Sequence, residues 1–266
     1  MKRPCIVIFP LYKPPSEIEL NFLENGSRKL GNYDQVIVCP ENLNIDKKYG
    51  KLKSLPIVRF PNNYFECIQG YNNLMLSNDF YKTFEKYEYI LIHQPDVYVF
   101  KNELDYWCSR KYDYVGAPWI RKKDNPLKKS FIAVRKLIQP SYGRTHNKVG
   151  NGGFSLRKVD RFIQVLESVP ENIISDYQNK KHKAYNEDVF WSIEAERVHP
   201  QFRVAPIKEA INFGIEFQPE IGYEMNSKQL PFGCHAPEIH GPQFWKKFIP
   251  ILRTTEVTLQ HETGNR

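Results

Sequence analysis

The sequence predicts an α/β fold in which helices flank a mainly parallel central sheet. Over the first hundred residues, short apolar runs alternate with helical patterns, which is typical of parallel strands joined by crossover helices. The 266 residues are enough to bury a sizeable core. The apolar run of residues 89–100, YILIHQPDVYVF, is interrupted by polar and turn-forming residues, which indicates a strand that ends at a site.

The first strand and the first helix follow directly from local patterns. Residues 5–10, CIVIFP, form an apolar, partly β-branched run that predicts a strand. Ser16 and Glu19 have the spacing of a capping box and predict a helix start. That helix is expected to stop near Gly31.

Three further strands complete the predicted first half. Residues 35–39 and 56–60, QVIVC and PIVRF, are β-branched and bounded by proline or polar residues. Residues 66–84 predict one helix with Ile68, Tyr71 and Met75 on one stripe, and EYILI at 88–92 predicts the fourth strand. Four strands in this order favour a nucleotide-binding half.

The pattern is less regular after residue 100. A short helix is expected at 104–109 and a strand within 112–118. A helix is expected to contain Val159, and another to begin near Glu187. The chain is predicted to form a single domain. Residues 1–100 are its nucleotide-binding half, residues 101–245 its less regular second half with a basic loop at 119–150, and residues 246–266 a C-terminal tail.

A basic segment from Trp119 to Lys148 contains a single acidic residue, Asp124. A segment of this length inside a compact domain is usually a lid or a binding loop, or is disordered. Phe131, Val134 and Ile138 fall at helical spacing, which is equally compatible with a helix on an anionic membrane surface and with a helix packed on the domain. The basic residues are Arg121, Lys122, Lys123, Lys128, Lys129, Arg135, Lys136, Arg144 and Lys148.

Composition narrows the functional classes only in part. A formal charge of +8 suggests an anionic partner or simply a basic solvated surface. Five widely spaced cysteines exclude a zinc ribbon and a disulfide framework. No apolar run is long enough to span a bilayer or to serve as a secretory signal, so a cytoplasmic protein is expected.

The strand ends direct attention to four residues. In open α/β sheets, ligands bind beyond the carboxyl ends of the strands. Pro10 and Tyr12 follow the first strand, and Gln94 and Asp96 follow the fourth, so these four are the candidate ligand-binding residues. An isolated buried carboxylate costs several kcal/mol, so Asp96 must be exposed or paired. An ordinary turn cap is an equally simple role for it.

Three later clusters also carry polar residues with simple structural explanations. Gly152 and Gly153 in VGNGGFSLRK could serve a tight turn. Glu187 and Asp188 in YNEDVFW could be first-turn acids stabilised by the helix dipole. His235 in PFGCHAP could be an ordinary loop histidine.

The order of these elements resembles the GT-A class of nucleotide-sugar glycosyltransferases. More closely, the chain is similar to a bacterial glycosyltransferase-like family catalogued as a domain of unknown function, in which QxD, NGGFSLR, NEDVFW and FGxH elements follow one another. The resemblance covers about residues 4–245. It implies a Rossmann-like GT-A fold with a less regular acceptor-side C-terminal half.

The resemblance implies a metal site. The Asp-x-Asp motif of the class falls on Gln94, Pro95 and Asp96, so Asp96 would bind a divalent cation that bridges the donor diphosphate. Gln94 replaces the first acid and brings no charge. His235 matches the late histidine that completes metal coordination in several members. Mn²⁺ suits an Asp and His pair, with Mg²⁺ as the alternative.

The resemblance also assigns the acceptor side. Asn151, Gly152 and Gly153 would press against the acceptor or the donor sugar, and Trp119 is grouped with them as a sugar-binding candidate. Asp188 is the candidate general base and Glu187 the candidate ligand of sugar hydroxyls, although the two acids could exchange roles.

The function implied is transfer of a sugar, from a UDP-linked donor by family analogy, to a glycan or lipid-linked acceptor in bacterial surface polysaccharide synthesis. If Asp188 stands opposite the leaving group, the anomeric configuration inverts. The expected location is cytoplasmic and peripheral at the inner face of the plasma membrane. One alternative is a non-catalytic protein that binds nucleic acid or anionic glycan, although no nucleic-acid motif is present. Another is a glycoside hydrolase with Asp96 and Asp188 as its carboxylates.

Overall fold

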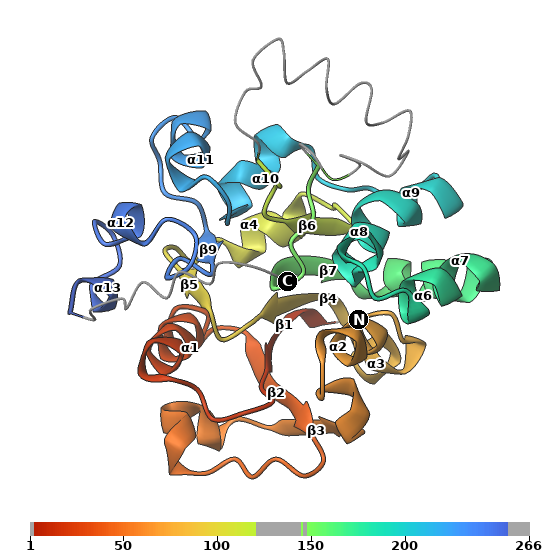
Figure 1. Ribbon diagram of the computed structural model, residues 1–266, viewed down its shortest axis with the longest axis horizontal. Helices are drawn as coiled ribbons and strands as arrows, with labels where there is room; N and C mark the ends of the chain where they lie inside the picture. Colours follow the sequence, from red (N-terminus) through yellow and green to blue (C-terminus); the bar gives the residue numbers. More distant parts are fainter. Residues whose placement is uncertain (1–2, 121–144, 146–147, 255–266) are drawn as a thin grey trace.

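The structure is a computed structural model that describes residues 3–120, 145 and 148–254. Its centre is a six-stranded sheet with helices on both faces (Figure 1). The first four strands in the spatial order are mutually parallel, and the fifth is antiparallel to both of its neighbours. The order across the sheet is β3 (Ile57–Phe60), β2 (Asp34–Pro40), β1 (Arg3–Pro10), β4 (Tyr87–His93), β7 (Phe154–Lys158) and β6 (Tyr114–Gly116).

Alternating side chains of the strands enter two different cores. In β1, Val7 and Phe9 face one core, whereas Ile6 and Ile8 face the other, as the two-residue period of a strand requires. Because both faces are buried, the strand is continuously apolar. The predicted fold class, a mainly parallel α/β sheet flanked by helices, is confirmed.

Helices cover the two faces of the sheet in separate groups. One face packs against α1 (Glu17–Lys29), η1 (Lys47–Ser54), α4 (Leu104–Ser109) and α10 (Ile207–Phe213). The other packs against α2 (Ile68–Met75), α3 (Asn78–Thr83), α6 (Val159–Ser168), α7 (Glu171–Asn179) and the continuous helical stretch of α8 (Glu187–Val189), the π-helical turn η4 (Phe190–Glu194) and α9 (Ala195–Val198).

A second sheet of three short strands lies beside the first. In it β9 is antiparallel to β5 and parallel to β8. A third apolar cluster joins this sheet to α1 and to the last helices. The strands are β5 (Val97–Val99), β9 (Gly233–His235) and β8 (Gly214–Ile215); the remaining elements are α11 (Pro219–Met225), α12 (Pro242–Trp245), α13 (Ile251–Thr254), η2 (Asn62–Tyr64) and η3 (Lys183–Tyr185).

The predicted start of the first helix is confirmed atom by atom. The Ser16 Oγ accepts a hydrogen bond from the Glu19 backbone N–H at 3.2 Å. The Glu19 carboxylate in turn accepts one from the Ser16 N–H at 2.6 Å. This reciprocal pairing satisfies two N–H groups that the first turn of a helix would otherwise leave unpaired.

The single helix predicted for residues 66–84 is wrong. The chain forms α2 and α3 instead, separated at Leu76 and Ser77. The Ser77 Oγ accepts a hydrogen bond from the Phe80 N–H and so caps a new helix. Of the three residues expected on one stripe, Met75 is buried but Ile68 is 71% exposed.

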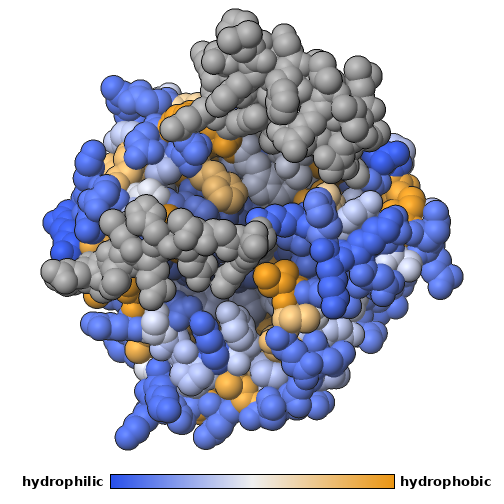
Figure 2. All heavy atoms as spheres, in the orientation of Figure 1, coloured by the Kyte–Doolittle hydropathy of each residue, from blue (hydrophilic) through white to orange (hydrophobic). Residues whose placement is uncertain are grey.

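Part of the predicted organisation lies outside the described residues. Residues 121–144 and 146–147 include most of the basic segment, with Phe131, Val134 and Ile138. The predicted division at residue 100 falls within the central sheet, since β6 and β7 lie beyond it and pair next to β4. The described helices include none with the length and apolar content needed to cross a membrane. On the face in Figure 2, the coloured residues are mainly hydrophilic, with small separate hydrophobic groups.

Candidate active site

One cavity of about 570 Å³ brings together nearly all of the predicted site residues. It lies at the carboxyl ends of β1 and β4, where the topology of an open α/β sheet predicts a ligand. Its volume is within the usual range for small-molecule sites. The predicted residues that line it are Pro10, Tyr12, Gln94, Asp96, Asn151, Gly152, Gly153, Glu187, Asp188 and His235.

Trp119 is the one predicted site residue that is not among the described residues lining this cavity. Its ring packs on the core formed by α2, α3 and α6. A Cβ added at Gly150 would lie 2.6 Å from this ring and 1.8 Å from the Ser192 Oγ. Trp119 therefore supports the chain leading to Asn151 instead of facing the cavity.

Three side chains form a row across the second sheet. β5 begins directly after Asp96, β9 ends at His235, and Glu216 directly follows β8. The His235 Nε2 lies 3.2 Å from the Asp96 Oδ1, and the His235 Nδ1 lies 3.0 Å from the Glu216 Oε1. An imidazole between two carboxylates is the central feature of this wall.

The two carboxylates set the charge state of the histidine. Burial alone would lower the pKa of His235, but Asp96 and Glu216 outweigh it and raise that pKa well above its usual range. For Asp96, burial acts to raise the pKa, and the charge and hydrogen bond of His235 reverse the effect and lower it. The ligand-free site thus holds an imidazolium beside ionised Asp96.

The same wall has donor atoms suited to a divalent cation. The Gln94 Oε1 and the Asp96 Oδ1 each lie 3.2 Å from the His235 Nε2. Two oxygens and an imidazole nitrogen are a donor set that Mn²⁺ accepts. Among the described residues there is no group of three His, Cys, Asp or Glu placed to hold a metal, so the third donor would be the Gln94 amide. The His235 Nε2 must lose its proton to serve as a ligand.

The two glycines of the 151–153 turn permit close packing of the site itself. A Cβ on Gly153 would lie 2.3 Å from the His235 Nε2 and 2.4 Å from the Gln94 Oε1. A Cβ on Gly152 would lie 2.0 Å from the Glu187 Oε1. These glycines were expected to make room for a sugar. Their nearest neighbours are the protein's own site residues.

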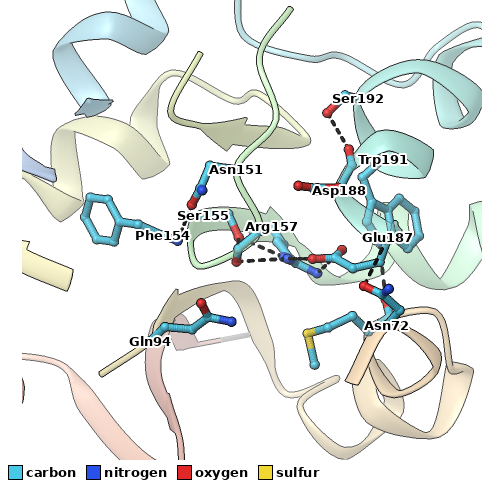
Figure 3. Close-up of polar contacts among 12 residues, drawn as sticks. Asn72, Gln94, Asn151, Phe154, Ser155, Arg157, Glu187, Asp188, Trp191 and Ser192 are labelled. Carbon is cyan, nitrogen blue, oxygen red and sulfur yellow. Dashed lines mark hydrogen bonds and ion pairs between the residues drawn. The ribbon is translucent and has the colours of Figure 1, made fainter. Parts of the chain in front are cut away.

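Glu187 is held by a buried arginine that the sequence analysis did not select. Arg157 on β7 contacts both carboxylate oxygens of Glu187, at 3.1 and 3.0 Å, and both side chains are almost fully buried (Figure 3). Arg157 also donates hydrogen bonds to the Tyr81 hydroxyl and the Gly152 carbonyl. With both oxygens engaged, Glu187 serves as an anchor for the start of α8.

Asp188 has a different environment from its neighbour. Its side chain lies apart from the Arg157–Glu187 pair in Figure 3, and it lines the cavity. Burial, followed by the charges of Glu187 and Glu216, raises the pKa of Asp188 well above its usual range. A π-helical turn follows immediately at η4, and such turns are frequent at functional sites. A basic carboxylate on the cavity wall can accept a proton.

The lining of the cavity is strongly acidic. Among the described residues that line it there is no lysine or arginine. Glu216 was not predicted, although it directly follows the short apolar run of 213–215. The six acidic residues that line the cavity are Glu19, Glu66, Asp96, Glu187, Asp188 and Glu216.

Comparisons with known proteins agree with this fold. Residues 54–235 match the model of a family described as a protein of unknown function (DUF5672). No curated protein matches the sequence. Among solved structures, mouse xyloside xylosyltransferase 1 is 9% identical with a TM-score of 0.51, and the match covers 88% of this chain and 97% of that one.

The bifunctional glycosyltransferase WbbM is a second similar structure. It is 12% identical with a TM-score of 0.50, and the match covers 96% of this chain. The chain spans 50% of the length of the WbbM chain. At these identities the likeness concerns the fold alone, which is a glycosyltransferase fold.

Proposed function

The chain belongs to the family described as a protein of unknown function (DUF5672), and from the geometry of its site we propose that it is a nucleotide-sugar glycosyltransferase. One observation carries the proposal. A single cavity at the strand ends has the Gln94, Asp96 and His235 wall, and the basic carboxylate of Asp188 lines it too. Transfer of a glycosyl group needs a site that binds the leaving diphosphate and a base that accepts the proton of the acceptor hydroxyl, both in one cavity.

The donor diphosphate needs more positive charge than the imidazolium of His235, already flanked by Asp96 and Glu216, supplies. Six carboxylates and no lysine or arginine line the cavity in the described residues, and two phosphates placed among carboxylates would be repelled. A divalent cation held by Gln94, Asp96 and His235 would neutralise the charge that develops on the leaving diphosphate. Mn²⁺ fits the donor set best, with Mg²⁺ as the alternative.

Asp188 is proposed as the general base. An acceptor hydroxyl attacks the anomeric carbon, its proton passes to the Asp188 carboxylate, and the bond from that carbon to the diphosphate oxygen breaks. A positioned base contributes about 10²- to 10⁴-fold to such a step. Displacement from the side opposite the leaving group inverts the configuration. Glu187, held by Arg157, keeps Asp188 in place at the start of α8.

The substrates are proposed by class. Tyr12 is 52% exposed at the cavity, where an aromatic face can stack on a nucleotide base. A UDP-linked donor and a glycan or lipid-linked acceptor of bacterial surface polysaccharide synthesis, at the cytoplasmic face of the membrane, complete the proposal. The acidic lining disfavours an anionic polymer in the cavity. The cavity beside Asp96 is within the size range of small-molecule sites, as a nucleotide donor requires.

A thermal-shift screen tests the donor and cation together. UDP, GDP, dTDP and CMP are each added with and without Mn²⁺. A ligand at 100 times its dissociation constant stabilises the native state by about 2.7 kcal/mol, which corresponds to roughly 5–10 °C in a chain of this size. We expect one nucleotide to reach this shift only with Mn²⁺.

Asp96→Ala should abolish the Mn²⁺-dependent part of that shift. Asp79→Ala is the matched control, because Asp79 is an exposed first-turn acid of α3 that is not among the residues lining the cavity. An undiminished shift in Asp96→Ala would refute the cation site. The absence of a shift with every nucleotide would refute the donor class.

A further inference from the structure

Glu216 is a buried carboxylate that is only half satisfied. The residue is 6% exposed, its Oε1 contacts His235, and its Oε2 is buried with no hydrogen-bond partner among the described residues. A buried charged group with a free oxygen costs stability. Such a group is better explained by a role in the site than by a contribution to folding.

Strand register brings Glu216 beside His235. In the parallel pair of β8 and β9, Gly214 is opposite Gly233 and Ile215 is opposite Cys234. One residue further along both segments, the same register places Glu216 beside His235. The contact therefore follows from backbone pairing and does not depend on a flexible loop.

The two ring nitrogens of His235 face different groups. Nδ1 lies 3.0 Å from the Glu216 Oε1, whereas Nε2 lies 3.2 Å from the Gln94 Oε1 and from the Asp96 Oδ1. His240 Nε2 is 4.0 Å from the same Glu216 oxygen, beyond hydrogen-bond distance. A carboxylate accepts hydrogen bonds and cannot donate, so its contact with Nδ1 requires a proton on Nδ1.

Asn151 competes with Glu216 for the same nitrogen. Its Nδ2 lies 3.1 Å from the His235 Nδ1, and it could donate only to an unprotonated Nδ1. The Asn151 Oδ1 accepts a hydrogen bond from the Phe154 N–H at 2.9 Å, which fixes the amide orientation. Without Glu216, the amide would favour a proton on Nε2 and block the cation side of the ring.

We infer that Glu216 is a positioning residue: it holds the Nδ1–H of His235, so that Nε2 is the ring nitrogen that becomes free to bind the cation beside Gln94 and Asp96. The inference rests on the proposed function, because the cation is part of that proposal. Histidine ligands of metals commonly donate their other N–H to a carboxylate, and loss of that partner typically weakens metal binding about 10- to 100-fold.

Nuclear magnetic resonance of the metal-free protein tests the hydrogen bond. In protein labelled with ¹⁵N-histidine, we expect a slowly exchanging Nδ1–H signal. Its disappearance in His235→Gln assigns the signal to His235. The signal should be lost in Glu216→Ala and kept in Glu216→Gln, whose amide oxygen still accepts. If the signal is unchanged in Glu216→Ala, the inference is overturned.

Electron paramagnetic resonance with Mn²⁺ alone tests the consequence. The dissociation constant should rise about 10- to 100-fold in Glu216→Ala, and Glu216→Gln should recover most of the affinity. Glu224→Gln is the control: this acid of α11 is exposed, pairs with Lys228, and is not among the described residues lining the cavity. It should bind Mn²⁺ as the wild type does.

The two measurements separate the inference from the proposed function. If the wild type binds Mn²⁺ and Glu216→Ala binds it equally well, the positioning role is refuted while the cation site stands. If the wild type binds no Mn²⁺, the cation proposal fails and the inference falls with it, even where the Nδ1–H signal responds to Glu216→Ala.

Discussion

At the scale of single residues, two adjacent acids have opposite surroundings. Glu187 is paired through both oxygens with buried Arg157, whereas Asp188 lines the cavity and has a pKa raised by burial and by neighbouring negative charge. A carboxylate compensated by an arginine is a poor base, and one with a raised pKa is a better base. The difference supports the proposal that Glu187 is the anchor and Asp188 the general base.

Asp188→Asn should lower the transfer rate about 10²- to 10⁴-fold and leave nucleotide binding intact. In the wild type, kcat/KM should rise with pH through the raised pKa of Asp188, because only the ionised form accepts a proton. A pH-rate profile checks the wild type, and a nucleotide thermal shift checks the variant. A variant that keeps full activity would show that Asp188 is not the base.

The same substitution has an expected effect on stability. Above the unfolded-state pKa, the folded protein binds more protons at Asp188 than the unfolded chain does, so stability falls as pH rises toward the raised pKa. Asp188→Asn removes this loss and should raise the melting temperature at pH 8. The expected rise is about 2–4 °C for each kcal/mol gained in the free energy of unfolding. Thermal unfolding of the wild type and the variant at pH 4 and pH 8 measures the difference. A rise in melting temperature at pH 4 as large as that at pH 8 would contradict this link between protonation and stability.

At the scale of elements, one ion pair connects the central sheet to α8. Arg157 belongs to β7 and Glu187 begins α8, and the Asn72 Oδ1 on α2 accepts a hydrogen bond from the Glu187 N–H. The first turn of α8 thus contacts two other elements through polar bonds. This explains why a three-residue helix followed by a π-helical turn holds a defined position.

Arg157→Met should destabilise the protein by about 3–5 kcal/mol, because it leaves Glu187 buried without a partner. Urea denaturation measures the loss. The double variant Arg157→Met, Glu187→Gln should recover part of the lost stability, because the unpaired charge is removed. Lys180→Met is the control, since its pair with Asp176 is half exposed, and it should change stability by less than about 1 kcal/mol. If Arg157→Met and Lys180→Met reduced the free energy of unfolding equally, the stabilising role of the buried ion pair would be contradicted.

At the scale of the whole molecule, the cavity is assembled from segments far apart in the chain. The central sheet contributes the ends of β1 and β4, the second sheet contributes His235 and Glu216, and the 151–153 turn and α8 complete the walls. The two sheets meet at residues 94–96, which connect β4 to β5. A ligand here therefore contacts both sheets.

Hydrogen exchange should report this assembly. The nucleotide identified in the screen, added with Mn²⁺, should slow exchange together in peptides containing 94–96, 151–153, 186–188 and 235, because one ligand covers all four. The helix α4 serves as the internal control, since it packs on the sheet through Leu104 and Trp107 and is not among the described residues lining the cavity. Protection confined to one of the four segments would contradict a shared site.

The sequence by itself determined the fold class, the first four strands, the capping box at Ser16 and the residue types at the strand ends. These follow from short-range periodicity and side-chain chemistry, which a linear pattern contains. Only the tertiary structure decided that Glu187 faces Arg157, that Gly152 and Gly153 make room for Glu187, Gln94 and His235, and that Glu216 joins the site. Those contacts depend on strand register and helix packing between distant segments, which local patterns do not specify.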